Sequence, residues 1–421
     1  MKKIIFISAV IIILTSPALY AQEWELKWPT YSKELKQKAK TDDNAYVDLA
    51  ICYGYGLGVK ADKKKCRKMF EETFGFTLYY EREAGERYPY ASLWYGIFMW
   101  DNSIHSEYLG WKAYGYDQNT IIDHLKSISI DYIWFAAKTG LEDAEIMYAR
   151  ANRGNTRRCN CVAIRKWNPD MVPLSMTNFG YYEKAKEWYD KACQHGNPII
   201  MLEYAKYLNS MAAYGYQNDE AELAYYWYKT AAEYGNAEAQ RLYAWYFENG
   251  IFESESLAEA AKWYVKAADQ GDAEAAGLAG RAMLLDSSMQ DKTIALDYLN
   301  KGTEQRNGLA AYHLGSCYES GEYLERDYNR ALECFTISAA ADNVDGLYAL
   351  GNFYENGYGC EIDMKKAAEA YEKCANLNSS NIHVGQAALK VADMYERGTG
   401  VFMNKKKAQD YREIAAQYKI Y

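Results

Sequence analysis

The sequence has few of the residues from which catalytic and metal sites are usually built. It contains five histidines in 421 residues, and none lies within helical metal-binding spacing of another. There is no Gly-x-Ser-x-Gly motif, and Cys159-x-Cys161 lacks a histidine at zinc-ligand spacing. These absences argue against a metal centre and a hydrolase nucleophile, so we expect no metal, no cofactor and no enzymatic activity.

Long hydrophobic runs are also absent, apart from Ile4–Leu14 near the N-terminus. This run follows Lys2 and Lys3, precedes an Ala21-Gln22 junction, and is too short to span a bilayer. Such an order is typical of a cleavable export signal, and the length disfavours the alternative of a membrane anchor. We therefore expect residues 1–21 to be removed. The mature chain should lack a transmembrane segment and be exported to the periplasm, or secreted beyond it.

The charge of the chain excludes one class of partner. Its formal net charge is −9 at pH 7, and loss of Lys2 and Lys3 with the signal makes the mature chain more acidic. An anionic surface repels phosphate backbones. We therefore expect no nucleic-acid partner.

What the sequence does contain is an internal repeat, marked by two columns of small residues. From each member of the second column to the next member of the first is 20 residues in six of eight cases, a register typical of repeat architectures. The first column is Ala50, Gly96, Ala149, Ala205, Ala244, Gly280, Gly315, Gly351 and Ala392, and the second is Cys66, Ser129, Ala185, Ala224, Ala260, Ala295, Ala331, Ala367 and Ala408.

Each unit of the repeat is expected to be a pair of helices, A and B. Around the first column the pattern A-x-x-x-L and x-x-Y-x-x-G places its members along one helical stripe. After the second column come an aromatic or bulky residue and, in several units, a glycine such as Gly196 or Gly271, which suits the left-handed position past a helix end. Small residues let paired helices approach closely. The nine members of each column predict nine such units.

Three segments carry a resemblance to a known family. GLGVKADKKKC from Gly56, GYGCEIDMKKA from Gly357 and GTGVFMNKKKA from Gly398 resemble the Sel-1-like repeats, a subclass of tetratricopeptide-type helix pairs. The resemblance covers about residues 40 to 421. It implies an all-α, right-handed superhelical solenoid of about nine helix-turn-helix repeats. It also implies an adaptor that holds proteins together through a concave groove lined by helices A.

Spacing divides the chain after the signal into three parts. Residues 22–40 are a lead-in, 41–185 are divergent repeats and 186–421 are regular repeats. Units two and three carry long insertions in the turn between helices A and B, at about residues 100–119 and 153–179. Adjacent repeats present equivalent turns on one edge, so the insertions should lie side by side and offer a binding face. Solvated or self-packing loops are the alternative.

Two groups of residues are the candidate partner contacts. The groove group is Arg241, Trp245, Tyr312, His313, Tyr348 and Asn352, and the insertion group is Trp111, Tyr114, Tyr116, Arg157, Arg158, Arg165 and Lys166. The aromatic and cationic insertion group suits sugar rings or an anionic partner. For Trp245 and Tyr348 packing between repeats is an equal alternative, because aromatic side chains fill such grooves.

Nine cysteines in an exported chain make disulfides plausible, although the odd count leaves at least one thiol unpaired in a monomer. Cys317 and Cys334 are placed symmetrically about the turn of their unit, and Cys52 and Cys66 have the same relationship. Some secreted Sel-1-like proteins carry such cross-links. In the alternative interpretation each cysteine is a small buried apolar residue.

Acidic residues also recur after the helix A tyrosine, at Glu319, Glu355 and Glu396. One repeat apart, they are too distant to form a catalytic pair, and a solvated or turn-capping role is expected.

Taken together, the sequence predicts a non-catalytic protein-interaction scaffold of the bacterial cell envelope. Its partner is expected in the concave groove or on the two insertions. A cell-wall or polysaccharide-binding module is the alternative, and an envelope hydrolase is the weakest hypothesis.

Overall fold

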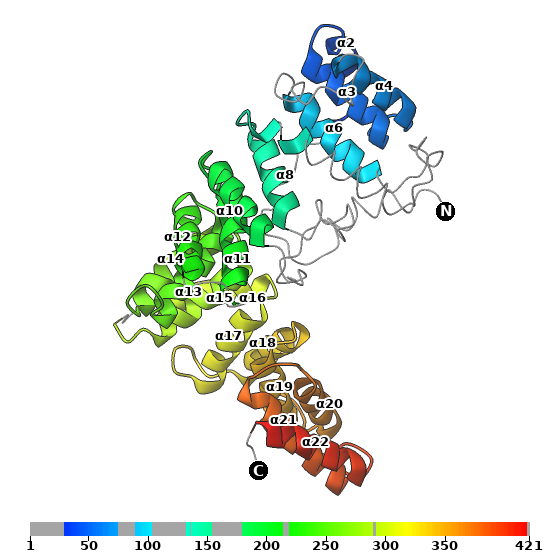
Figure 1. Ribbon diagram of the computed structural model, residues 1–421. Coiled ribbons are helices and arrows are strands. Elements are labelled where there is room, and N and C mark those ends of the chain that lie inside the picture. Colours follow the sequence, from blue (N-terminus) through cyan, green and yellow to red (C-terminus); the bar gives the residue numbers. More distant parts are fainter. Residues whose placement is uncertain are drawn as a thin grey trace. The chain divides into compact units, whose positions relative to one another are not determined.

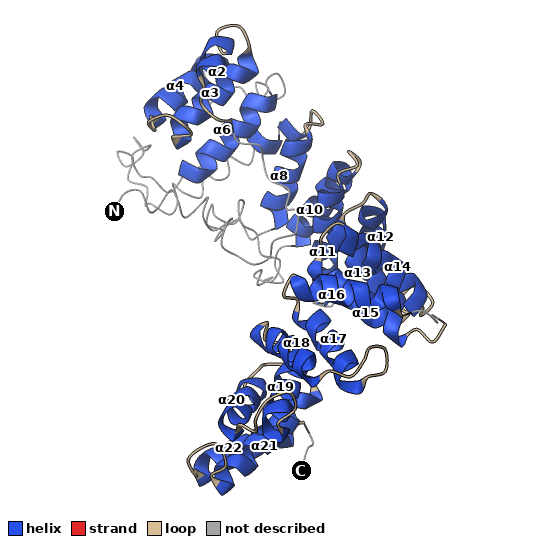
Figure 2. Ribbon diagram, turned by 180° about the vertical axis from the view of Figure 1, so that it is seen from behind, coloured by secondary structure: helices blue, strands red, loops and turns tan. Residues whose placement is uncertain are grey.

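The computed structural model describes residues 29–74, 89–102, 132–134, 136–153, 179–213, 219–288 and 292–418. In these ranges every regular element is a helix, as the all-α prediction requires (Figure 2). The helices divide between two compact units, Gln22–Tyr234 and Gly235–Tyr421. We describe the two units separately.

The unit Gly235–Tyr421 is a stack of helical hairpins. Each helix packs against the next one in sequence, and α15, α17, α19 and α21 also touch in succession. In Figure 1 α17 to α22 follow one another in colour order from yellow to red. The odd-numbered helices are helices A and the even-numbered ones are helices B: α13 (Ala237–Asn249), α14 (Leu257–Asp269), α15 (Ala273–Leu285), α16 (Thr293–Glu304), α17 (Gly308–Ser320), α18 (Tyr328–Ala340), α19 (Val344–Asn356), α20 (Met364–Ala375), α21 (Ile382–Arg397) and α22 (Lys405–Gln417). The predicted repeat solenoid is thereby confirmed.

The unit Gln22–Tyr234 contains helix pairs of the same kind, such as α3 with α4 and α11 with α12. Helix α3 packs against α2, α4 and α6, while α10 packs against α8 and α11, and α11 against α12. The helices are α2 (Lys33–Lys38), α3 (Asp43–Tyr55), α4 (Lys63–Phe74), α6 (Pro89–Asn102), α8 (Glu142–Arg153), α10 (Phe179–Cys193), α11 (Pro198–Ala213) and α12 (Asp219–Glu233). Most of both predicted insertions lies outside the described residues.

The two columns of small residues lie where helices approach most closely. Every described member of both columns is buried, and Ser129 alone lies outside the described ranges. A Cβ added at Gly280 would lie 2.5 Å from Leu299 Cγ, and one at Gly351 would lie 2.6 Å from Tyr371 Cε1. Larger side chains would push the helices apart, so the columns set the spacing of the hairpins.

Helix ends are fixed by local chemistry. Side-chain oxygens accept hydrogen bonds from backbone N–H groups at the start of most of these helices, as Asn307 does for Ala310 N and Asp363 for Lys366 N. Helices α13, α17, α19 and α21 end at a glycine in the left-handed conformation, for example Gly321 with φ +72°. Polar caps and glycines thus divide the chain into short helices.

The second glycine of the Gly-x-Gly turn has a different role from the first. Gly400 has φ +73°, and a Cβ there would lie 2.1 Å from the carbonyl oxygen of Met364. The turn of the last hairpin therefore lies directly against the first residue of α20. The first glycine, Gly398, has φ +69°, but the nearest atom to its added Cβ is 3.6 Å away, an ordinary contact distance.

The predicted cysteine pairs are free thiols in the structure, and all four residues are buried. Cys317 and Cys334 pack in one apolar cluster with Leu314. Burial raises the pKa of the Cys317 thiol and of the Cys334 thiol to about 11, which keeps both protonated at neutral pH. The structure describes the reduced chain, and the two disulfides stay predictions.

We predict that Gly400→Ala destabilises the protein more than Gly398→Ala. Both substitutions force an alanine into the left-handed region at a cost of about 1 kcal/mol, but only Gly400→Ala adds a backbone clash, which brings its total to about 2–4 kcal/mol. Urea denaturation of the two variants measures the difference. Equal losses would contradict the close contact between the turn and α20.

Candidate functional site

The candidate site is a pocket on the helix A side of the unit Gly235–Tyr421. It encloses about 460 Å³ and is formed by α13, α14, α15 and α17. Its lining is Arg241, Leu242, Trp245, Glu248, Asn249, Tyr264, Glu274, Leu278, Arg281 and Leu309. Two of the six predicted groove contacts, Arg241 and Trp245, therefore lie in one pocket wall.

Arg241 joins two consecutive helices A. Its Nε donates to Asp272 Oδ2 at 3.1 Å, and its Nη1 lies 3.0 Å from Glu274 Oε2. Asp272 is also the N-cap of α15, where it accepts from Ala275 N. The guanidinium is thus held in one orientation and its charge is balanced by α15.

A second charged group in the pocket lining joins α13, α14 and α15. Glu248 accepts a hydrogen bond from Tyr264 at 2.8 Å and another from Arg281 Nη2. Burial, and then the bond to Glu248, raises the pKa of Tyr264, so the hydroxyl remains a donor at neutral pH. Arg281 Nε is buried without a hydrogen-bond partner among the described residues, an uncommon state for a polar group.

The Trp245 indole is the prominent apolar surface of the pocket. It is 46% exposed and meets only Tyr246 edge-on among the described rings, with 5.4 Å between centroids. Leu242, Leu278 and Leu309 supply the other apolar lining. An exposed aromatic ring beside leucines and balanced charges can accept a bulky side chain of a partner.

Tyr312 and His313 are on the next helix A, α17. His313 lies near Arg281, and burial followed by that positive charge lowers the pKa of His313 to about 4. Its imidazole is therefore neutral at pH 7. Tyr312 is largely used in packing, since its ring contacts those of His313 and Phe335 at 5.2 and 6.0 Å between centroids.

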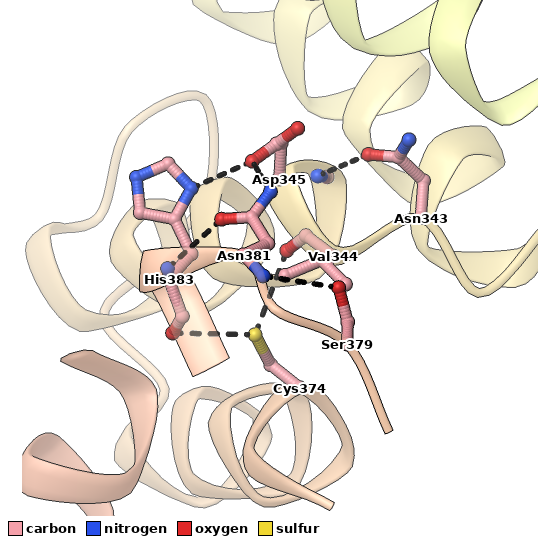
Figure 3. A network of polar contacts seen from close by, with 8 residues as sticks. Asn343, Val344, Asp345, Cys374, Ser379, Asn381 and His383 are labelled. Atoms are coloured by element: carbon pink, nitrogen blue, oxygen red, sulfur yellow. Dashed lines mark hydrogen bonds and ion pairs between the residues drawn. The ribbon is translucent and has the colours of Figure 1, made fainter. Parts of the chain in front are cut away.

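Tyr348 and Asn352, on α19, both contact other side chains of the unit Gly235–Tyr421. Tyr348 stacks on His383 with 4.5 Å between ring centroids, and His383 Nδ1 lies 2.7 Å from Asp345 Oδ1. Asn381 donates to the same carboxylate oxygen (Figure 3). Asn352 Oδ1 accepts from Asn356 Nδ2 at 2.7 Å. Tyr348 therefore packs between repeats, which is the alternative given for it in the sequence analysis.

Figure 3 also shows the contacts at the connection between α20 and α21, which is longer than the connections between the preceding repeats. The 20-residue spacing becomes 25 between Ala367 and Ala392, and the extra chain precedes and lengthens α21. Asp345 holds the start of α21 through Asn381 and His383. The Sγ of Cys374 lies 3.5 Å from the carbonyl oxygen of Val344 and 3.6 Å from that of His383, and its one S–H is shared between them. Polar contacts therefore fix the position of α21 relative to α19, where the regular 20-residue spacing is lost.

The insertion contacts cannot be placed in the same way. Trp111, Tyr114, Tyr116, Arg157, Arg158, Arg165 and Lys166 all lie outside the described residues.

Acidic residues four positions after the first column form a set that the sequence only partly indicated. Glu355 accepts from Tyr371 at 2.8 Å and from Lys390 at 2.9 Å, as Glu248 does from Tyr264 and Arg281. The expected solvated role is therefore wrong for Glu355, because a helix B tyrosine and a cation from the next helix A both reach it.

Glu319 occupies the same position in α17 but has neither a hydrogen bond nor an ion pair among the described residues. Phe335 stands where the tyrosine would be, and it has no hydroxyl to donate. Burial raises the pKa of Glu319. The hairpin of α17 and α18 thus contains a partly buried carboxylate, Glu319, that no described side chain stabilises by a hydrogen bond or an ion pair.

The described residues offer no cluster of His, Cys, Asp or Glu arranged to hold a metal ion. None of the helices that the structure describes has both the length and the apolar character needed to span a bilayer.

We predict opposite stability effects for Glu319→Gln and Glu355→Gln. A folded-state pKa raised above the unfolded one means that ionised Glu319 costs stability at pH 7, and that this cost disappears as the pH falls below about 4. Glu319→Gln should therefore stabilise by up to about 1 kcal/mol at pH 7, a value limited by solvent screening, with no gain below pH 4. Glu355→Gln should destabilise by about 1–2 kcal/mol. Thermal melts between pH 3.5 and 7 measure both. Destabilisation by Glu319→Gln at pH 7 would show an unrecognised partner.

Comparison with one solved structure supports the fold. A Sel1 repeat protein from Oxalobacter formigenes superposes with a TM-score of 0.60 at 19% identity, covering 97% of this chain and 96% of that one. A protective antigen of uropathogenic Escherichia coli with an SLR fold covers 94% and 91% at 17% identity, with a TM-score of 0.39. No curated protein matches the sequence.

A family model described as the Sel1 repeat matches seven segments of the chain, which together make up more than half of it. The segments are residues 43–72, 182–197, 201–236, 237–272, 308–343, 344–379 and 385–417. Helices α15 and α16 fall between two matches, yet they form the same hairpin. Sel1 repeat proteins are generally non-catalytic scaffolds for protein interactions. The chain is a member of the Sel1 repeat family.

Proposed function

We propose that this protein is a non-catalytic scaffold that binds a protein partner on the helix A side of the unit Gly235–Tyr421. The observation that carries the proposal is the pocket around Trp245. It combines a half-exposed indole with arginines that are already held by carboxylates. Tryptophan and arginine are the residues most enriched where protein interfaces gain their binding energy.

The geometry favours a protein side chain over a free charged metabolite. Arg241 and Arg281 are paired with Asp272 and Glu248, so the pocket has oriented donors but little uncompensated charge. Leucines line the rest of it. An apolar or aromatic side chain of a partner would bury these surfaces against Trp245.

The groups near the pocket support a scaffold rather than an enzyme. The imidazole of His313 is neutral, and no described serine or cysteine is hydrogen-bonded to it as an activated nucleophile would be. The buried thiols of Cys317 and Cys334 have pKa values near 11, so neither is a thiolate at neutral pH.

We further propose that the scaffold works in the bacterial cell envelope. The support is the N-terminal order of Lys2 and Lys3, the apolar run Ile4–Leu14 and the Ala21-Gln22 junction.

Trp245→Ala is expected to weaken partner capture from an envelope extract at least tenfold while leaving the melting temperature nearly unchanged, because the indole is half exposed. Tyr226→Ala is the matched control, since Tyr226 is 53% exposed on a helix B. Quantitative mass spectrometry of the captured proteins measures the effect. Equal capture by wild type and Trp245→Ala would exclude this pocket as the binding site.

Export predicts a defined N-terminus. Protein recovered from the periplasmic fraction of expressing bacteria should begin at Gln22, as measured by intact mass. A chain that retains Met1, or that stays in the cytosolic fraction, would contradict the proposed location.

A further inference from the structure

The last hairpin ends in an exposed apolar tip that no helix packing explains. Phe402 is 96% exposed and Met403 is 64% exposed, although both are large apolar residues. Ile362, in the turn of the preceding hairpin, is 65% exposed. The two turns adjoin, because Gly400 lies against the carbonyl of Met364. We call Ile362, Phe402 and Met403 the apolar tip.

Lysines follow both parts of this tip in the sequence. Segment 398–407 contains Lys405, Lys406 and Lys407 and no acidic residue, in a chain with a net charge of −9. Lys407 is bonded to the Tyr395 hydroxyl at 2.7 Å, whereas Lys405 and Lys406 are exposed and make no hydrogen bond or ion pair with the described residues. Lys365 and Lys366 add two exposed cations at the start of α20.

These lysines are placed where a helix does not favour them. The first turns of α20 and α22 carry the positive end of the helix dipole, which makes a cation there unfavourable. Lys366 is offset by Asp363 at 3.6 Å and Lys365 by Glu369 at 4.0 Å, but both pairs are exposed and weak. Lys405 also makes a minor contribution, behind Arg412, to lowering the pKa of Glu396. Because these exposed contacts stabilise the fold little, an external anion is the natural counterpart.

Another turn of the same unit provides the contrast. Phe252 is 51% exposed in the turn after α13, but it is followed by Glu253 and Glu255, and neither that turn nor the first turn of α14 contains a lysine. An exposed aromatic residue in a turn is therefore not always accompanied by cations in this protein. The combination occurs at the apolar tip.

We propose that the apolar tip and its lysines dock on the surface of an anionic phospholipid bilayer. Phe402 and Met403 enter the boundary between headgroups and acyl chains, and Lys405 and Lys406 lie among the lipid phosphates. Either contribution alone gives weak, reversible binding, whereas a short apolar insertion and a basic patch reinforce each other. The surface of an anionic bilayer offers both acyl chains for the exposed apolar residues and phosphates for the exposed lysines.

The test is co-sedimentation of the mature chain with vesicles of phosphatidylcholine containing about 30% phosphatidylglycerol, beside vesicles of phosphatidylcholine alone. We expect binding to the anionic vesicles only, and its loss at about 0.5 M NaCl. Phe402→Ser/Met403→Ser and Lys405→Gln/Lys406→Gln should each reduce the partition coefficient at least tenfold. Phe252→Ser, the matched control, should bind like wild type, and thermal melts should show all variants folded.

Several outcomes would overturn the proposal. They are absence of binding to anionic vesicles, equal binding to neutral ones, and retention of binding by Phe402→Ser/Met403→Ser. If only the lysine variant loses binding, the patch is a general polyanion site and not a membrane dock. Trp245→Ala should bind vesicles normally, so failure here is independent of the proposed partner pocket.

Discussion

The structure depends on the close approach of helices at the two columns of small residues. At Gly280 and Gly351 the neighbouring Leu299 and Tyr371 side chains already occupy the space that a methyl group would need. Because each hairpin buries its apolar surface only against its neighbours, the contact has to be repeated in every unit. The repetition explains why described members of both columns are buried even where family similarity fades, as in α15 and α16.

The same packing decides which positions are left for function. Two buried tyrosines of helices B donate their hydroxyls to carboxylates of helices A, Tyr264 to Glu248 and Tyr371 to Glu355. These buried tyrosines therefore fix the orientation of carboxylates on the helix A side. Where a phenylalanine replaces the tyrosine, at Phe335, the carboxylate of Glu319 is left without a donor.

Part of the candidate site could be predicted from sequence. Arg241 and Trp245 were found because they occupy variable positions on the helix A stripe, and the structure places both in one pocket. Tyr348 has the same sequence signature, yet it stacks on His383, which the lengthened α21 brings from 35 residues away. Glu248, Tyr264 and Arg281 went unrecognised. Their spacing from the columns was visible, but which of them meet depends on contacts between three helices.

The sequence by itself determined the helical class, the hairpin unit and the buried columns, because each of these depends on spacing within about 40 residues. Helix caps and left-handed glycines are likewise local properties, read from one or two side chains. Only the tertiary structure decided which side chains of successive helices A face one another. It also showed that the turns bearing Ile362 and Phe402 adjoin, because Gly400 allows two backbones to come into contact. Pairings across repeats depend on the angle and distance between helices, and these are set by the packing of whole hairpins rather than by any one segment.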